Sequence, residues 1–140
     1  MTTINSIYSM LFLAVLSCLA PSIAYAEKYS LPDGAYDVLE RLGLSDDELD
    51  NASIDDGALV FLLDDETLKR ERVFRIINTV CDYTRSYPSE FKDSPFSSIN
   101  VMTLTQTTEV IVRGGIKTCL YLPPNANEKE LSRYIELRRH

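Results

Sequence analysis

An apolar leader at the start of the chain does most to limit what the rest can fold into, because it sets both the compartment and the number of cysteines that remain. Residues 10–19 are mainly apolar, Pro21 breaks any helix, and Ala24-Tyr25-Ala26 places small residues where a signal peptidase requires them. We therefore predict that residues 1–26 are a cleaved signal peptide. Residues 27–140 would then form one globular domain, exported to the periplasm or the extracellular space.

Two other interpretations of the leader stay open. Residues 15–18 loosely resemble a bacterial lipobox, which makes Cys18 a candidate for lipidation, and an uncleaved leader would tether the domain to a membrane. The first 26 residues also lack Lys and Arg, which is unusual for a signal peptide. Cleavage is favoured because the apolar stretch is short for a membrane span and is polar at Asn5 and Ser6. We expect no stable membrane span after cleavage.

Two cysteines, Cys81 and Cys119, remain in the mature chain. In an oxidising compartment two thiols of one small domain usually pair. On the chain-entropy model a bridge across about 40 residues stabilises the fold by about 4 kcal/mol. The spacing is not the Cys-x-x-Cys of a redox-active dithiol. We therefore predict a structural disulfide between them.

The formal net charge of −7 is distributed unevenly. Residues 27–66 hold thirteen acidic residues against Lys28 and Arg41, whereas residues 67–140 hold eight acidic and twelve basic residues. Binding to phosphate backbones needs clustered Lys and Arg, so the acidic half argues against nucleic acid as a partner. Anionic membrane surfaces are disfavoured for the same reason.

The acidic half provides the candidate partner-binding residues Asp46, Asp47, Asp50, Asp55 and Asp56. We interpret them as a docking surface for a protein with a basic surface, since complementary fields speed encounter and select partners. The alternative is an ordinary solvated face. A calcium loop beginning at Asp46 is excluded, because the positions that need Gly and a bidentate Glu do not hold them.

Helical patterns dominate residues 27–85. We expect a first helix over 35–42 and a brief second helix from Asp46, where Ser45 and Glu48 form a capping-box pattern. The main helix is expected over 65–85. Residues 58–63 are six consecutive apolar residues, and their periodicity leaves strand and helix open. We interpret them as helix.

The composition then changes to alternating and β-branched residues. We expect a three-stranded antiparallel sheet over about 99–122, with Gly114-Gly115 as the tight turn between its last two strands. Cys119 on the last strand would then join the sheet to the main helix. Residues 127–138 are expected to form a C-terminal helix. It would cover the second sheet face, with Ile111, Ile116 and Leu120, unless a partner does. The predicted fold class is α+β.

Catalytic groups are scarce. The only histidine is His140, so a Ser/His or Cys/His site is not expected, and zinc spacings and phosphate loops are missing. We predict no catalytic, metal-binding or cofactor-binding residues. The pairs Asp55 with Asp56 and Asp64 with Asp65 leave a small carbohydrate-active hydrolase as an alternative.

The sequence as a whole favours an exported, non-enzymatic protein-binding domain that presents an acidic surface to another protein with a basic surface. An inhibitor or immunity-type protein would act in this way. The rival hypothesis is a subunit or assembly factor of an envelope or secretion apparatus, which would use the apolar second sheet face as its interface. No motif in the chain is specific enough to indicate a family.

Overall fold

The structure is a computed structural model that describes residues 28–140. The predicted signal peptide, its cleavage site and Cys18 lie outside the described residues. The helices are α1 (Asp33–Leu42), α2 (Asp46–Asp50), α3 (Arg70–Ser86), α4 (Ile116–Tyr121) and α5 (Glu128–Ser132), with a 3₁₀ turn, η1, at Pro88–Phe91. The strands are β1 (Lys28–Tyr29), β2 (Ser53–Asp55), β3 (Ala58–Leu63), β4 (Ser98–Thr103), β5 (Thr108–Arg113) and β6 (Ile135–Arg139).

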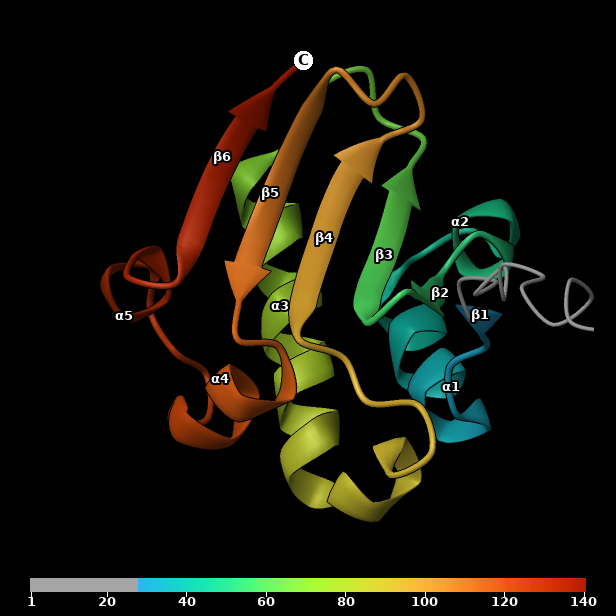
Figure 1. Ribbon diagram of the computed structural model, residues 1–140. Coiled ribbons are helices and arrows are strands. Elements are labelled where there is room, and N and C mark those ends of the chain that lie inside the picture. The colour runs from blue at the N-terminus through green and yellow to red at the C-terminus, as the bar shows by residue number, and fades with distance from the viewer. Residues whose placement is uncertain (1–27) are drawn as a thin grey trace, which may run out of the picture.

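All six strands belong to one mixed sheet in the order β1-β2-β3-β4-β5-β6. β3 and β4 are parallel, and every other neighbouring pair is antiparallel. Parallel neighbours need a long crossover connection, and α3 supplies it. In Figure 1, α3 crosses behind the sheet, while the face of β3 to β6 turned toward the viewer carries no helix. The α+β class is therefore correct, and the architecture has two layers, with the helices gathered on one face.

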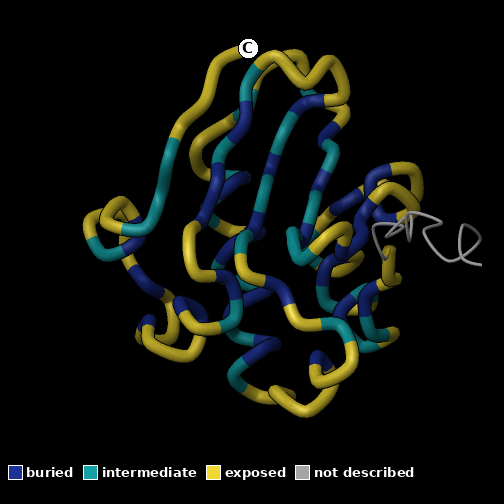
Figure 2. Tube along the Cα trace, in the orientation of Figure 1, coloured by how far each residue is buried: buried dark blue, intermediate teal, exposed yellow. Residues whose placement is uncertain are grey.

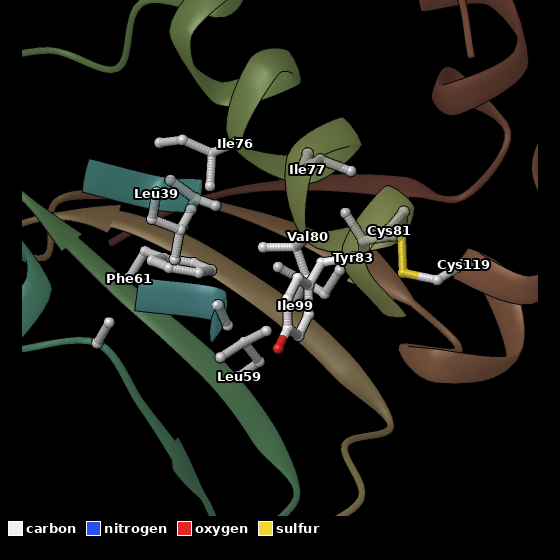
Figure 3. Packing of buried hydrophobic residues seen from close by; sticks show 14 of the residues in the cluster. Leu39, Leu59, Phe61, Ile76, Ile77, Val80, Cys81, Tyr83, Ile99 and Cys119 are labelled. Atoms are coloured by element: carbon white, nitrogen blue, oxygen red, sulfur yellow. A yellow bond between two sulfur atoms is a disulfide. The ribbon is translucent and has the colours of Figure 1, made fainter. Parts of the chain in front are cut away.

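The core lies between the sheet and α3. Burial alternates along β3, with Leu59, Phe61 and Leu63 fully buried, and the same alternation continues along β4 (Figure 2). Helix α1 adds Leu39 to the same cluster, beside Ile76 of α3 (Figure 3). Side chains on the helix-facing side are thus removed from water, and their burial is the main force that holds the two layers together.

Cys81 and Cys119 are joined by a disulfide, which is the predicted pair. The prediction that it links a helix to the sheet is wrong, because Cys119 lies on α4 and the bridge joins α3 to α4 (Figure 3). Arg85 of α3 supports the same junction, since it donates to the carbonyls of Cys119 at 2.7 Å and Leu122 at 2.9 Å. These carbonyls lie at the end of α4, where backbone acceptors lack helical partners.

The predicted three-stranded antiparallel sheet over 99–122 is wrong in its last strand. Residues 116–121 form α4, and β5 pairs with β6 instead. Gly114 and Gly115 both have positive φ, as a hairpin turn would need, but Gly115 lies against the backbone of Phe96. A Cβ at Gly115 would lie 2.3 Å from the Phe96 carbonyl oxygen. The glycine pair therefore permits a close approach between chain segments and does not turn a hairpin.

The prediction of a helical N-terminal half is also wrong, because this half contributes β1, β2 and β3. Residues 58–63 are a central strand, with β2 on one side and β4 on the other. Asp56 and Gly57 connect β2 to β3 with φ values of 49° and 76°, and two successive positive φ values suit the twist of a tight hairpin. A place at the centre of the sheet thus overrides the helix propensity of Ala and Leu.

The predicted C-terminal helix is confined to α5, and the remainder of that segment is β6. Asn127 and Glu130 form a capping box at its start, with side-chain bonds in both directions. The helix ends after five residues, and Ile135–Arg139 pairs along β5. The segment therefore extends the sheet sideways instead of covering its second face.

Candidate interaction surfaces

The five aspartates singled out by the sequence are all exposed, in two groups. Asp46, Asp47 and Asp50 lie on α2, and Asp55 and Asp56 lie at the β2–β3 hairpin. Helix α2 lies beside one end of β2, and the hairpin turn lies at the other end (Figure 1). None of the five side chains forms an ion pair within residues 28–140. The structure thus leaves this surface, called here the acidic surface, with its negative charge uncompensated.

Glu48, the remaining acid of α2, is buried and has a different role. It completes the capping box with Ser45, and its carboxylate accepts bonds from Arg72 Nη2 at 2.6 Å and from the Asp64 N–H at 3.2 Å. Arg72 also pairs with Asp65 at 2.8 Å. Burial alone would raise the pKa of Glu48, but the bonds from Arg72 and from two backbone N–H groups outweigh it and lower that pKa. Glu48 therefore anchors α2 to α3 and to the end of β3.

The two edges of the sheet carry opposite charge. The acidic residues between positions 33 and 56 lie in α1, in α2 and at the β2–β3 hairpin, whereas Arg133, Arg138 and Arg139 lie in or next to β6 at the opposite edge (Figure 1). Of these three arginines, only Arg138 forms an ion pair within the described chain, with Glu136 at 2.8 Å. The charge separation along the sequence thus becomes a charge separation across the molecule.

One face of the sheet has no helical cover in the described part of the chain. Val60, Leu62 and Met102 lie on it and are half-buried. The prediction that Ile111, Ile116 and Leu120 share this second face is wrong in part. Of these residues only Ile111 lies on it, whereas Ile116 packs against the core from α4. We call this surface, formed by alternate residues of β3 to β6, the open face.

A polar pair lies near the middle of the open face. Asn100 Nδ2 donates to Glu109 Oε1 at 2.7 Å, and His140 Nε2 lies 3.3 Å from Glu109 Oε2. Glu109 is buried despite its place on this face, with 8% of its surface exposed. The Oδ1 atom of Asn100 is buried and has no partner among residues 28–140. A buried acceptor without a donor is costly, so this atom is a local weakness of the described fold.

A groove of about 720 Å³ lies on the other side of the sheet, between α3 and β6. Its apolar wall is formed by Leu68, Phe74, Val110, Ile135 and Leu137. Leu137 is 55% exposed, which is unusual for a leucine on the helix-facing side of a sheet. Helix α3 covers the centre of the sheet but leaves this margin uncovered. We call this feature the β6 groove.

β6 is also one of the two edge strands of the sheet, since the strand order among residues 28–140 begins with β1 and ends with β6. The Arg113 N–H donates to the Tyr134 carbonyl at 2.8 Å, and the His140 N–H donates to the Thr107 carbonyl at 2.9 Å. Alternate residues of a strand direct their N–H and C=O groups to opposite sides. The backbone groups of residues 135, 137 and 139 therefore point away from β5, toward the open edge.

The two pairs of aspartates considered for a hydrolase lie apart from each other. Asp55 and Asp56 precede β3, whereas Asp64 and Asp65 follow it, so the two pairs lie at opposite ends of a six-residue strand. Within residues 28–140, no three His, Cys, Asp or Glu side chains are grouped as a metal site would need. Among the same residues, no helix has both the length and the apolar character required to cross a bilayer.

Comparisons with protein families, with curated proteins and with solved structures find no match to this chain.

Sequence reasoning missed the β6 groove and the free edge. The helical spacing of Leu131, Tyr134 and Ile135 concealed a second signal, the alternation of Ile135, Leu137 and Arg139. That alternation is the period of a strand. It would have indicated β6, but not the groove, which depends on where α3 ends relative to the sheet.

Proposed function

We propose that residues 27–140 are an exported, non-enzymatic protein-binding domain whose acidic surface docks onto a basic protein, as an inhibitor or immunity-type protein would. The observation that carries this proposal is the contrast within α2. Its buried acid, Glu48, is fully bonded, while Asp46, Asp47 and Asp50 are exposed and make no ion pair in the described chain. Unpaired carboxylates on one surface attract a cationic partner over distances near the Debye length.

The fixed position of α2 supports the same proposal. The Ser45 capping box holds the start of the helix, and Arg72 ties Glu48 to α3. The three aspartates therefore keep their relative positions before a partner arrives. A surface that is already ordered loses less entropy on binding, and this increases affinity without additional contacts.

The test is affinity capture with the oxidised mature chain from secreted and envelope fractions, at about 0.1 M and about 1 M salt, where the Debye lengths are about 10 Å and 3 Å. We expect a captured protein with a basic surface that is released at high salt. The variant Asp46→Asn/Asp47→Asn/Asp50→Asn, called here the α2 amide variant, should lose it.

The matched control changes the net charge equally but away from α2. Its substitutions are Glu66→Gln, Glu71→Gln and Asp93→Asn, all at exposed acids without an ion pair in the described chain. Capture should survive in this control. Equal loss in both variants, or capture that does not respond to salt, would contradict docking through the acidic surface.

A second candidate, a subunit or assembly factor of an envelope or secretion apparatus, is favoured by the open face. Val60, Leu62 and Met102 are half-exposed there, and the buried Asn100 Oδ1 lacks a donor within residues 28–140. A second copy of the chain placed on this face would bury the three side chains. Sedimentation of the mature domain separates the candidates, because a compact monomer contradicts self-assembly and a dimer abolished by Met102→Lys supports it.

A further inference from the structure

We propose that the β6 groove binds an extended, acidic segment of another protein, which joins the sheet as a seventh strand beside β6. This site is separate from the acidic surface, which lies at the opposite edge of the sheet and carries the opposite charge. The proposal depends on three features that coincide at β6: an edge with no strand paired to it among residues 28–140, an apolar groove along that edge, and the guanidinium group of Arg139, which forms no ion pair in the described chain.

The backbone edge supplies the pairing. Residues 135, 137 and 139 direct N–H and C=O groups outward, as the bonds of Tyr134 and His140 to β5 establish. An incoming extended segment would bond to these groups as β5 does on the other side. Edge strands are usually blunted by a covering element, by charged side chains, by proline or by bulges. Among residues 28–140 no strand pairs with the outer side of β6, and its five residues contain no proline, although three of them are charged and α5 lies beside the start of the strand (Figure 1).

The groove supplies side-chain recognition. In a strand the backbone groups and the side chains alternate with the same period, so the residues that point their N–H groups outward also share one face. Ile135, Leu137 and Arg139 are therefore all on the helix-facing side, and all three line the groove. Alternate side chains of an added strand would extend over the same face. One of them would reach the apolar wall beside Phe74 of α3.

Charge selects the kind of segment. Among residues 28–140, Arg70 and Arg139 are the only charged residues that line the groove, and no acid of this range lines it. Arg139 has no ion pair in the described chain, whereas Arg70 pairs with Glu128 at the surface and lies 5.7 Å from the centre of the Phe74 ring. A guanidinium binds a carboxylate with two parallel hydrogen bonds. The preferred segment therefore has an apolar residue near Leu137 and an acidic residue two positions along, near Arg139.

The first experiment selects, from a random linear peptide library displayed on phage, the peptides that bind the oxidised mature chain. We expect selected peptides to share an apolar residue and an acidic residue two positions apart. Synthetic labelled copies of the selected peptides are then measured by fluorescence anisotropy. Selection of basic peptides, or of peptides without this spacing, would overturn the proposal.

Variants of the protein test each feature separately. Leu137→Pro removes an outward donor together with a side chain of the groove wall, but no bond to β5, and should weaken binding about tenfold or more. Phe74→Ala should weaken binding severalfold, because it removes an aromatic side chain from the groove wall. Arg139→Gln should weaken the binding of acidic peptides. It should not change the binding of peptides whose acidic residue is replaced by its amide. Leu120→Ala, at an exposed leucine of α4, is the matched control and should bind as the wild type does.

A modification of the peptide keeps the test independent of protein folding. N-methylation of alternate peptide amides removes the ladder donors while the protein stays unchanged, so it should abolish binding in one register and spare it in the other. Binding that tolerates methylation in both registers would overturn strand addition. The α2 amide variant should bind these peptides normally, which distinguishes failure of this proposal from failure of the acidic-surface proposal. Self-association of the chain through β6 in place of peptide binding would also overturn it.

Discussion

The acidic side of the molecule and the β6 edge differ in how the backbone groups of α2 and of β6 are bonded, not only in charge. At the acidic edge, α2 is a capped helix whose buried Glu48 bonds to Arg72 and to the Asp64 N–H. At the basic edge, β6 is held by its ladder with β5 and leaves outward N–H and C=O groups unpaired within the described chain. A satisfied backbone offers only side chains, which suits a folded partner. An unsatisfied edge suits an extended one.

The disulfide should affect the basic edge more than the acidic edge. Replacing Cys81 and Cys119 by alanine is expected to lower the free energy of unfolding by about 4 kcal/mol. Because α4 lies between β5 and β6 in the chain, losing its bond to α3 frees the connection that leads into β6. Chemical denaturation measures the total effect. Hydrogen exchange should rise further in β6 than in β2, and an equal rise would show that the two edges are not held separately.

Loss of Arg72 should destabilise the acidic edge more than β6, the reverse of the effect expected for loss of the disulfide. Arg72→Met leaves the Glu48 carboxylate buried without its charged partner, and we expect a loss of about 2–3 kcal/mol because breaking a buried pair strands one charge. Helix α2 should exchange faster, while β6 should be unaffected. Arg75→Met is the control on the same helix, since Arg75 is exposed and forms no ion pair in residues 28–140.

Proline substitutions at neighbouring positions of β6 should separate its two sides. Glu136→Pro removes an N–H that points toward β5 and should cost about 1–3 kcal/mol, the range for a lost ladder bond with its partner left unsatisfied. Leu137→Pro removes an outward N–H and should cost less, because proline is tolerated on the open side of an edge strand. Thermal unfolding compares the two. Equal losses of stability in the two variants would mean that the N–H group of residue 137 does not point outward.

Acidification should weaken the acidic edge through Glu48. Its pKa in the folded state is lowered, so its stabilising contribution is complete above the unfolded value of 4.5 and is lost as the pH falls through the folded value. Glu48→Gln should therefore be less stable than the wild type near pH 7. The difference should narrow as the pH falls below 4.5, as urea denaturation between pH 3 and 7 would show. A difference in stability that stays constant with pH would mean that the variant is destabilised by altered packing instead.

The smallest expected effect on stability belongs to the acidic surface itself. The α2 amide variant should unfold within about 0.5 kcal/mol of the wild type, since its three substitutions are at exposed side chains without ion pairs in the described chain. Asp46 and Asp47 lie in the first turn of α2, so the loss of favourable helix-dipole interactions sets the sign of the small change. Calorimetry checks this expectation. A large loss would mean that these acids are structural.

Local signals predicted local structure well. The capping boxes at Ser45 and Asn127 are both present, because each depends on residues only three positions apart. Gly43 ends α1 with a φ of 105°, as its place after the last apolar residue indicated. The disulfide pair was predictable for a different reason, since only two cysteines follow the leader.

Non-local features were beyond local reasoning. Asp56-Gly57 and Gly114-Gly115 are both plausible hairpin turns, yet only the first joins two strands. The difference comes from Phe96, which lies distant in sequence from Gly115 but against it in space. Residues 135–139 similarly became a strand because β5 was available to pair with them. Of the candidate surfaces, the acidic surface could be predicted from the composition of the sequence. The β6 groove could be recognised only from the folded structure.

The disulfide also encloses the hairpin of β4 and β5 in a covalent ring that runs from Cys81 to Cys119. The turn between these strands is exposed around Leu104 and Gln106, and exposed turns are where proteases cut first. One cut there would open the ring without releasing either part. Such a nicked molecule would run as one band on a non-reducing gel and as two after reduction, and it could keep all its strands paired.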